Sequence, residues 1–356
     1  MAATASGWSD YPYLQPNLTL SDGTPRNYLA EADVNGLSVR YARKVSDQSI
    51  CEVGIRNADP TAPGFRTRAT VEHACYRLLA LGVTPRIEGD LSKDGGLDEE
   101  ARRTLSEVNS GLKFKDPWRR GARPLADIGV LHPGLCGAST DTIAGVTQIL
   151  EEGGHQFDVL DLNMDFSPYR ALIGPDVSHS DERWSAKVKA CLSDGGAVLT
   201  GCANTDYASA RPDTGTDKRS VALLENHFES YARYATPLHK RAVLDSIAKL
   251  LPEPLLRHDG PSTLFTSVLE QKELNRWVIH LIYYQPQRRA AGIDVIDSYI
   301  PLHEVKFSLR APGPIRQISL RPQHHDTLDF WEKSGRTEFV VRKMAGHQIV
   351  SVEFAQ

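Results

Sequence analysis

The sequence predicts an α/β protein of several domains with a flavodoxin-like domain at its centre. In residues 126–202, apolar runs that end in turn residues alternate with amphipathic helical patterns, which indicates a mainly parallel sheet covered on both faces. Helical and strand patterns also alternate before residue 118, whereas apolar residues recur with a period of two from residue 262 onward. We therefore expect three domains, at 1–118, 119–260 and 261–356.

The first 35 residues show little periodicity, and residues 7–14 are expected to form a loop. This segment is rich in aromatic and turn residues, and it contains Trp8, Asp10 and Tyr11. Two interpretations stay open at this point. These side chains either pack on the protein surface or form a rim that stacks on a sugar.

The segment from residue 33 to residue 118 alternates helices with strands. In the first strand, apolar residues alternate with Glu52 and Arg56, and the second strand is followed at once by Glu88 and Asp90. The C-terminal ends of strands form the catalytic face of a (β/α)8 barrel. Two strands cannot close a barrel, so we predict a partial (β/α)8 barrel remnant with an unpaired strand edge near Cys51. Helices are expected at 33–44, at 67–81 and after Asp98, and strands at 49–57 and 83–87.

The central stretch has the clearest signals for where helices begin and end. Ser139, Thr140 or Asp141 can cap its first helix, and Gly153 can end it. A second helix begins near Ser180. The expected strands are 126–133, 157–162, 169–174 and 197–201.

After the central stretch, residues 203–236 are polar, which predicts a long surface loop. A helix is expected to follow at 238–251. In the remaining chain, apolar and polar residues alternate with a period of two in short runs that Gly and Pro residues separate. This pattern is typical of a small antiparallel β-sandwich. Its expected strands are 264–269, 277–284, 304–309, 315–320, 337–341 and 348–354.

Composition excludes several classes of protein. With 40% hydrophobic residues, 24% charged residues and a net charge of −4, the chain lacks the basic character of proteins that bind nucleic acid or anionic membranes. No apolar run is long enough to span a bilayer, and residues 1–10 lack the features of a signal peptide, so a cytoplasmic protein is expected. The five cysteines are widely spaced, which favours buried reduced thiols.

A group of short segments resembles the junction between catalytic barrel and next domain in α-L-fucosidase-like glycoside hydrolases, a group similar in layout to the family-42 β-galactosidases. Those enzymes have a barrel, a glutamine-amidotransferase-like trimerisation domain and a β-sandwich. The resemblance covers the whole chain but only the later part of the barrel. It departs at residues 89–94, where the family usually has a GDQLHP-like string and this chain has GDLSKD. The resembling segments are 72–76, 80–82, 87–91, 96–98, 116–118 and 126–131, with 301–305 and 346–350 in the sandwich.

Glycoside hydrolysis usually needs two carboxyl groups, one to protonate the leaving oxygen and one to attack or to activate water. In a barrel-mouth context the candidates are Glu88, Asp90 and Glu52, with Asp10 available from its loop. Arg56 is a candidate for binding a sugar hydroxyl. The alternative is that these carboxylates bond loop backbone or pair with arginines. In related barrels the acid/base comes from an earlier strand, which this chain lacks.

Other possible sites are weaker. Cys202 follows a strand as an amidotransferase nucleophile would, yet it lacks the tight elbow and a convincing helix after it. His132 with Cys136, and the 324–326 His-His-Asp segment, have no spaced partners, so neither a metal nor another cofactor is expected.

The leading hypothesis is a carbohydrate-active protein related to glycoside hydrolases of terminal fucosides or galactosides, assembled as a homo-oligomer, a trimer by the resemblance. The absent strands would come from a partner chain or an upstream segment. The alternatives are a non-catalytic oligomerisation or sugar-binding module, and an amidotransferase-like hydrolase using Cys202. Neither a nucleic-acid nor a membrane partner is expected.

Overall fold

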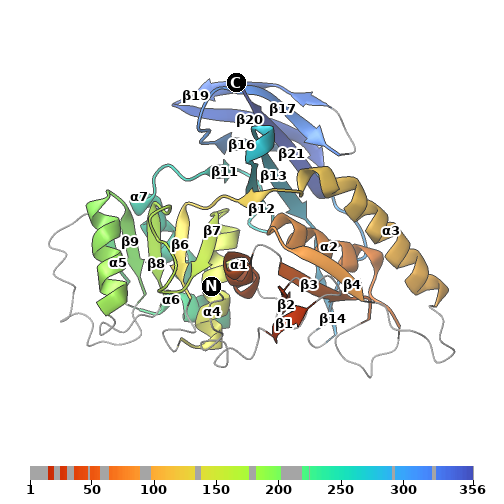
Figure 1. Ribbon diagram of the computed structural model, residues 1–356, viewed down its shortest axis with the longest axis horizontal. Coiled ribbons are helices and arrows are strands. Elements are labelled where there is room, and N and C mark those ends of the chain that lie inside the picture. Colours follow the sequence, from red (N-terminus) through yellow and green to blue (C-terminus); the bar gives the residue numbers. More distant parts are fainter. Residues whose placement is uncertain are drawn as a thin grey trace.

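The structure is a computed structural model. In Figure 1 the strands and helices form three groups: β1–β4 with α2 and α3 on one side, a helix-covered sheet on the other, and antiparallel strands above both. Among the described residues, no helix is long and apolar enough to cross a membrane. The described residues are 36–46, 49–56, 64–88, 98–132, 138–175, 182–201, 219–223, 225–290, 293–322 and 326–355, together with the strand backbones of 15–19 and 25–29.

The N-terminal group contains a sheet of order β1-β2-β3-β4 within the described ranges. β1 and β2 are antiparallel, whereas β2, β3 and β4 run parallel. The loop expected at residues 7–14 lies outside the described residues, whereas β1 and β2 form in a stretch for which the sequence predicts no strand. The unpaired edge expected near Cys51 is wrong, because β3 is paired on both sides. The elements are β1 (Gln15–Thr19), β2 (Pro25–Leu29), α1 (Gly36–Val45), β3 (Ser49–Gly54), α2 (Arg68–Ala80), β4 (Thr84–Glu88), α3 (Glu99–Lys115) and the 3₁₀ turn η2 (Asp116–Trp118).

Local signals set the helices of this group. The Thr67 side chain accepts from the backbone N–H of Thr70 at the start of α2, and the Asp98 side chain accepts from that of Glu100 at the start of α3. Gly82 follows α2 with a φ of 80°, a conformation that suits glycine. The cap at Asp98 lies where the sequence predicts it, and α2 occupies most of the helix expected at 67–81.

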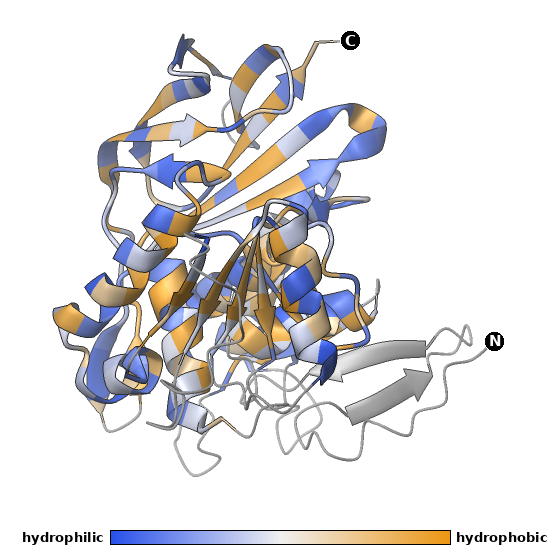
Figure 2. Cartoon of the chain, turned by 90° about the vertical axis from the view of Figure 1, so that its left-hand side faces the viewer, coloured by the Kyte–Doolittle hydropathy of each residue, from blue (hydrophilic) through white to orange (hydrophobic). Residues whose placement is uncertain are grey.

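The central group contains a parallel sheet of order β10-β9-β8-β6-β7 among the described residues. Strands β6, β7 and β8 are buried along their whole length, and β9 nearly so, as parallel strands usually are, whereas the edge strand β10 is partly exposed. Ile128, Val130 and Ile173 belong to the core under α4 and α7, whereas Leu131 and Leu172 belong to a separate core under α5. Figure 2 shows these strands in the colour of hydrophobic residues. The elements are β6 (Ile128–Leu131), α4 (Thr140–Glu152), β7 (Phe157–Leu160), β8 (Ala171–Gly174), α5 (Glu182–Ser193), β9 (Ala197–Thr200), β10 (Ser220–Ala222), α6 (His227–Tyr234) and α7 (Pro237–Leu250).

Part of the long surface loop expected over residues 203–236 forms a strand and a helix instead. β10 adds to the edge of the parallel sheet beside β9, and α6 packs against α4. The close approach needs a glycine, because a Cβ at Gly145 would lie 1.9 Å from the carbonyl oxygen of Phe228.

Two larger antiparallel sheets and the small β14-β15 sheet make up the C-terminal group in the described part of the chain. The larger sheets have the orders β11-β16-β20-β19 and β18-β17-β21-β13-β12-β5, and both contribute to one core, in which the ring centroids of Phe307 and Phe339 lie 5.3 Å apart. The elements are β5 (Arg123–Pro124), β11 (Leu256–His258), β12 (Phe265–Gln271), η5 (Lys272–Leu274), β13 (Arg276–Tyr283), β14 (Gln287–Ala290), β15 (Ile293–Val295), β16 (Leu302–Leu309), β17 (Ile315–Arg321), β18 (Thr327–Leu328), β19 (Phe330–Lys333), β20 (Arg336–Met344) and β21 (Gly346–Phe354).

A buried group of charges joins the three groups. Arg40 of α1 donates from Nη1 to Glu151 Oε1 at 2.7 Å, and Arg77 of α2 pairs with the other oxygen of the same carboxylate. The Arg40 guanidinium lies 3.9 Å from the ring centroid of Phe157 in β7, and that of Arg77 lies 4.7 Å from the ring of Phe265 in β12. The Glu151 carboxylate thus binds the guanidinium groups of Arg40 and Arg77. These also contact an aromatic ring of the parallel sheet and one of an antiparallel sheet.

Burial opposes the ionisation of Glu151, yet the charges of Arg77 and Arg40 hold its pKa below the ordinary value. Burial lowers the pKa of Arg40 to about 10, against the opposing effect of Glu151. Both side chains therefore stay charged at neutral pH, and each depends on the other for compensation.

We expect Glu151→Gln to lower the free energy of unfolding by about 3 to 5 kcal/mol, because it leaves two guanidinium groups without their carboxylate. Urea unfolding at pH 7 measures this change. Because the Glu151 pKa is lowered in the folded state, the difference in free energy of unfolding between wild type and Glu151→Gln is fully present above pH 4.5. This difference decreases as the pH falls below that value.

Glu99→Gln is the matched control, since Glu99 pairs with Arg102 at a site where both side chains are 66% exposed. Its cost should stay within about 0.5 kcal/mol. Equal costs for the two variants would contradict the role assigned to the buried group.

Candidate active site

One side of β3 and β4 is polar, and it carries three of the predicted site residues. In the parallel register Glu52 lies opposite Arg86, and Gly54 lies opposite Glu88. Arg56 follows Gly54 two residues later, so its side chain leaves the strand on the same side. Glu52, Arg56 and Glu88 therefore share one side of the sheet, towards the C-terminal ends of the strands.

The other side of β3 is apolar and faces α2. Cys51 and Val53 are fully buried and share a core with Val71 and Cys75 of α2. Because α2 covers this side, the polar residues point away from the helix. A barrel strand has the same two sides, with its helix outside and its polar residues towards the lumen.

The polar residues differ in exposure. Glu52 and Arg56 are partly buried, whereas Glu88 is exposed. The Arg56 guanidinium lies 4.6 Å from the ring centroid of Phe65, and Arg66 donates from Nη1 to the carbonyl oxygen of Gly54 at 3.0 Å. These contacts hold the end of β3 and orient Arg56. The arrangement offers carboxylates and a guanidinium that can bond the hydroxyl groups of a sugar.

The remaining predicted residues lie outside the described residues. These are Trp8, Asp10, Tyr11 and Asp90, and also Cys202, Cys136 and the pair at 324–325. His132 is described, and it is buried with its ring 4.9 Å from that of Tyr41. Burial lowers the pKa of His132 to about 4, so it is neutral at pH 7, which agrees with a core role.

A second polar site, which the sequence does not predict, lies between α2, α3 and the start of β21. It is a hollow of about 820 Å³ whose lining includes Glu72, Tyr76, Lys115, Tyr299 and His347. Glu72 is buried, and it accepts from Arg68 Nε at 2.8 Å and from the Tyr299 hydroxyl at 2.6 Å.

Lys115 is the unusual residue of this hollow, because it is only 3% exposed. In the part of the chain that the structure describes, no hydrogen bond or ion pair reaches its ammonium group, which lies 4.2 Å from the ring centroid of Tyr76. Burial lowers its pKa to about 8 against the attraction of the Glu72 charge. Its position as the last residue of α3 predicts an exposed lysine, so no sequence signal marks it.

A buried histidine pair adjoins Lys115. His280 Nδ1 and His347 Nε2 are 2.9 Å apart, and the His347 ring lies 4.9 Å from that of Tyr76. Burial lowers the pKa of His280 to about 3 and that of His347 well below its ordinary value. Both rings are therefore neutral at pH 7, and one donates to the other.

Comparison with known proteins identifies the fold. No family model matches the sequence, and no curated protein matches it. In structure the chain is similar to α-L-fucosidase isoenzyme 2 from Paenibacillus thiaminolyticus, with a TM-score of 0.80 and 21% identity over 90% of this chain and 62% of that chain. The resemblance to an α-L-fucosidase-like fold is thus confirmed, and this chain spans less than two thirds of the fucosidase.

Two β-galactosidases are more distant neighbours. Gan42B, a GH42 β-galactosidase from G. stearothermophilus, has a TM-score of 0.55 and 12% identity over 89% of this chain and 56% of its own. The β-galactosidase from Rahnella sp. R3 has a TM-score of 0.51 and 13% identity over 88% of this chain and 56% of its own. At these identities the likeness is one of fold.

We expect Lys115→Met to raise the free energy of unfolding at pH 7 by about 1 to 3 kcal/mol, because it removes an uncompensated buried charge. The folded-state pKa of Lys115 is about 8 and the ordinary value is 10.5. The buried charge therefore lowers the free energy of unfolding of the wild-type protein by its full amount below pH 8, and this effect disappears as the pH rises to 10.5. Urea unfolding between pH 7 and pH 10.5 follows this change.

Lys113→Met on the same helix is the control, because Lys113 is exposed and its substitution should change the free energy of unfolding at pH 7 by less than about 0.5 kcal/mol. A Lys115→Met protein that is less stable than wild type at pH 7 would contradict the prediction.

Proposed function

We propose that this protein is carbohydrate-active and related to the glycoside hydrolases that act on terminal fucosides or galactosides. The observation that carries the proposal is the likeness in fold to an α-L-fucosidase over 90% of the chain. The two β-galactosidase neighbours support the same class of substrate.

The proposal assigns a role to each group of elements. Residues 1–118 form a partial TIM-barrel-like segment, 119–260 a flavodoxin-like, glutamine-amidotransferase-like domain of the trimerisation type, and 261–356 a β-sandwich. Three observations support this division: the parallel strands β2 to β4 with one polar side, the parallel sheet covered on both faces, and the two antiparallel sheets that share a core.

The sugar site of this proposal is the polar side of β3 and β4. Glu88, Asp90 and Glu52 are the proposed catalytic carboxylates, and Arg56 is a proposed substrate-binding residue, with Trp8, Asp10 and Tyr11 as a proposed rim. Hydrolysis of a glycoside needs one carboxyl group that protonates the leaving oxygen and a second that attacks the anomeric carbon or activates water. The shared side of Glu52 and Glu88 supports these roles, because two carboxylates there can face one sugar ring.

We expect the protein to hydrolyse 4-nitrophenyl α-L-fucoside or β-D-galactoside. Glu88→Gln and Asp90→Asn should each lower kcat/KM by roughly 100-fold or more, because each removes a group that transfers a proton or attacks in the transition state. Release of 4-nitrophenol measures the rate, and the matched control Glu99→Gln should leave it unchanged.

Cys202→Ala tests the amidotransferase-like alternative in the same assay. It should leave hydrolysis of both aryl glycosides unchanged. Activity lost in the Cys202→Ala protein alone would overturn the assignment of the carboxylates. A wild-type protein that neither hydrolyses nor binds fucosides and galactosides would overturn the proposal as a whole.

A second candidate function is a non-catalytic oligomerisation or sugar-binding module. The observation that favours it is a hollow of about 1080 Å³ on the antiparallel sheets, lined among others by Trp331, Asp329 and Arg342. Trp331 is 41% exposed, and its Nε1 donates to Glu338 Oε2 at 3.0 Å, which fixes the ring. A fixed aromatic ring beside charged groups can stack on a sugar and bond its hydroxyls.

If this second function is correct, Trp331→Ala should weaken the binding of methyl fucoside or methyl galactoside by roughly 10-fold or more in calorimetry, and Glu88→Gln should leave it unchanged. The chain should also be a trimer in light scattering. Tyr234 and Leu238, which are 70% and 66% exposed near the α6–α7 turn, are available for such contacts or for a partner chain. A monomer that binds no sugar would exclude this function.

A further inference from the structure

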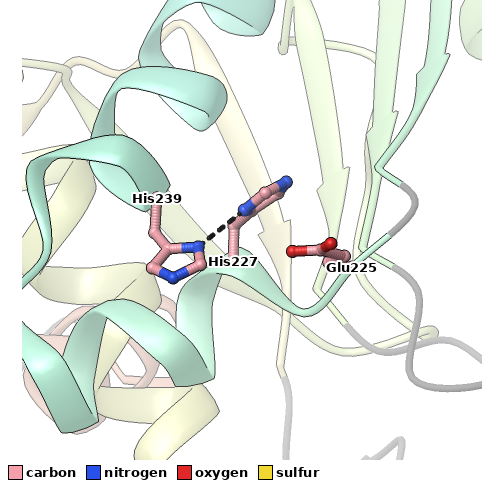
Figure 3. A group of neighbouring side chains, drawn as sticks. All are labelled: Glu225, His227 and His239. Atoms are coloured by element: carbon pink, nitrogen blue, oxygen red, sulfur yellow. Dashed lines mark hydrogen bonds between the residues drawn. The ribbon is translucent and has the colours of Figure 1, made fainter.

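A group of metal-ligating side chains lies at the edge of the parallel sheet, apart from the polar side of β3 and β4. Glu225 follows the end of β10, His227 is the first residue of α6, and His239 lies in the first turn of α7. Figure 3 shows the two imidazole rings facing each other, with the carboxylate of Glu225 beside them. Ligand sites in α/β sheets commonly lie beyond the carboxyl ends of the strands, where these residues are.

The distances fit a shared metal ion. The Nδ1 atoms of His227 and His239 are 3.0 Å apart, and one ligand atom of each of the three residues lies within 4.8 Å of the others. Two imidazole nitrogens bound to one tetrahedral zinc ion, at about 2.0 to 2.1 Å each, are roughly 3.3 Å apart. The two nitrogens share a hydrogen bond at close to the required spacing, and an ion that replaced this bond would separate them slightly and draw in the exposed Glu225 side chain.

The backbone that holds the histidines is well defined by its contacts. Asn226 caps α6, where its side chain accepts from the backbone N–H of Glu229 at 3.1 Å and donates to Thr142 Oγ1 of α4 at 2.9 Å. Between the two helices Ala235 has a φ of 49°, a left-handed conformation that ends α6 and turns the chain into α7. These contacts bring two histidines twelve residues apart in sequence into contact.

The contact between the two rings holds a single proton, because one imidazole nitrogen donates and the other accepts. A divalent cation in place of that proton would bind the lone pairs of both nitrogens, and the neighbouring Glu225 carboxylate would add an anionic ligand.

We propose that Glu225, His227 and His239 form a binding site for a divalent transition-metal ion, with Zn²⁺ as the ion it takes. Two imidazoles and one carboxylate are the donors that zinc prefers, whereas Mg²⁺ favours oxygen ligands alone. Three protein ligands leave the fourth position to water. The ion would fasten β10, α6 and α7 together at the edge of the sheet.

Calorimetric titration of the full chain, first treated with a chelator, tests the site with ZnCl₂ at pH 7.5. We expect one equivalent of Zn²⁺ to bind, whereas MgCl₂ should give no such binding. His227→Gln and His239→Gln should each weaken this zinc equivalent by roughly 100-fold, because each removes one ligand while it keeps a side chain of similar size. His303→Gln is the matched control, since His303 is exposed on β16 and far along the chain.

Two further readouts separate ligand loss from misfolding. Zn²⁺ should raise the melting temperature of the wild-type and His303→Gln proteins but not that of the two ligand variants. Circular dichroism should be the same for all four proteins without metal. Should wild type bind no zinc, or should both ligand variants keep its full affinity while folded, the proposal would be overturned.

Discussion

The buried carboxylate of Glu151 is the constraint on which the arrangement of this protein depends. It lies between the guanidinium groups of Arg40 and Arg77, which come from two helices of the N-terminal group. Those guanidinium groups in turn contact Phe157 of the parallel sheet and Phe265 of an antiparallel sheet. A buried charge without its partner is costly. The three groups of elements therefore have few ways to lie against one another.

Helix α2, which pairs with Glu151 through Arg77, also positions residues of both polar sites. Its buried face lies under β3, so its position decides that Glu52 and Arg56 point away from it. The same helix supplies Glu72 and Tyr76 to the hollow at Lys115, and its first turn is tied to a later segment because Thr67 Oγ1 donates to the Ile296 carbonyl oxygen at 2.6 Å. A displacement of α2 would therefore change the candidate sugar site and the hollow together. This coupling makes the N-terminal group an integral part of the structure.

Much of the fold could be predicted from sequence because its signals are local. The caps at Thr67, Asp98 and Ser139, and the period-two alternation of Cys51, Val53 and Ile55, act over a few residues. The same alternation predicted that Glu52 and Arg56 share one side of a strand. Strands β1 and β2 could not be predicted, because β2 pairs with β3 and β1 pairs with β2, and neither strand has a pattern of its own. Within residues 203–236, β10 and α6 could not be predicted either, since they are held by β9 and α4.

By itself, the sequence determined where most helices begin and end, the alternation that gives β3 a polar side, and the resemblance to an α-L-fucosidase-like fold. Only the tertiary structure decided that Lys115 is buried, that Glu151 pairs with two arginines, and that His227 meets His239. The physical reason is the range of the interactions. Caps and periodicity act between residues close in the chain, whereas burial and charge compensation depend on elements up to hundreds of residues apart, such as α3 and β21 around Lys115.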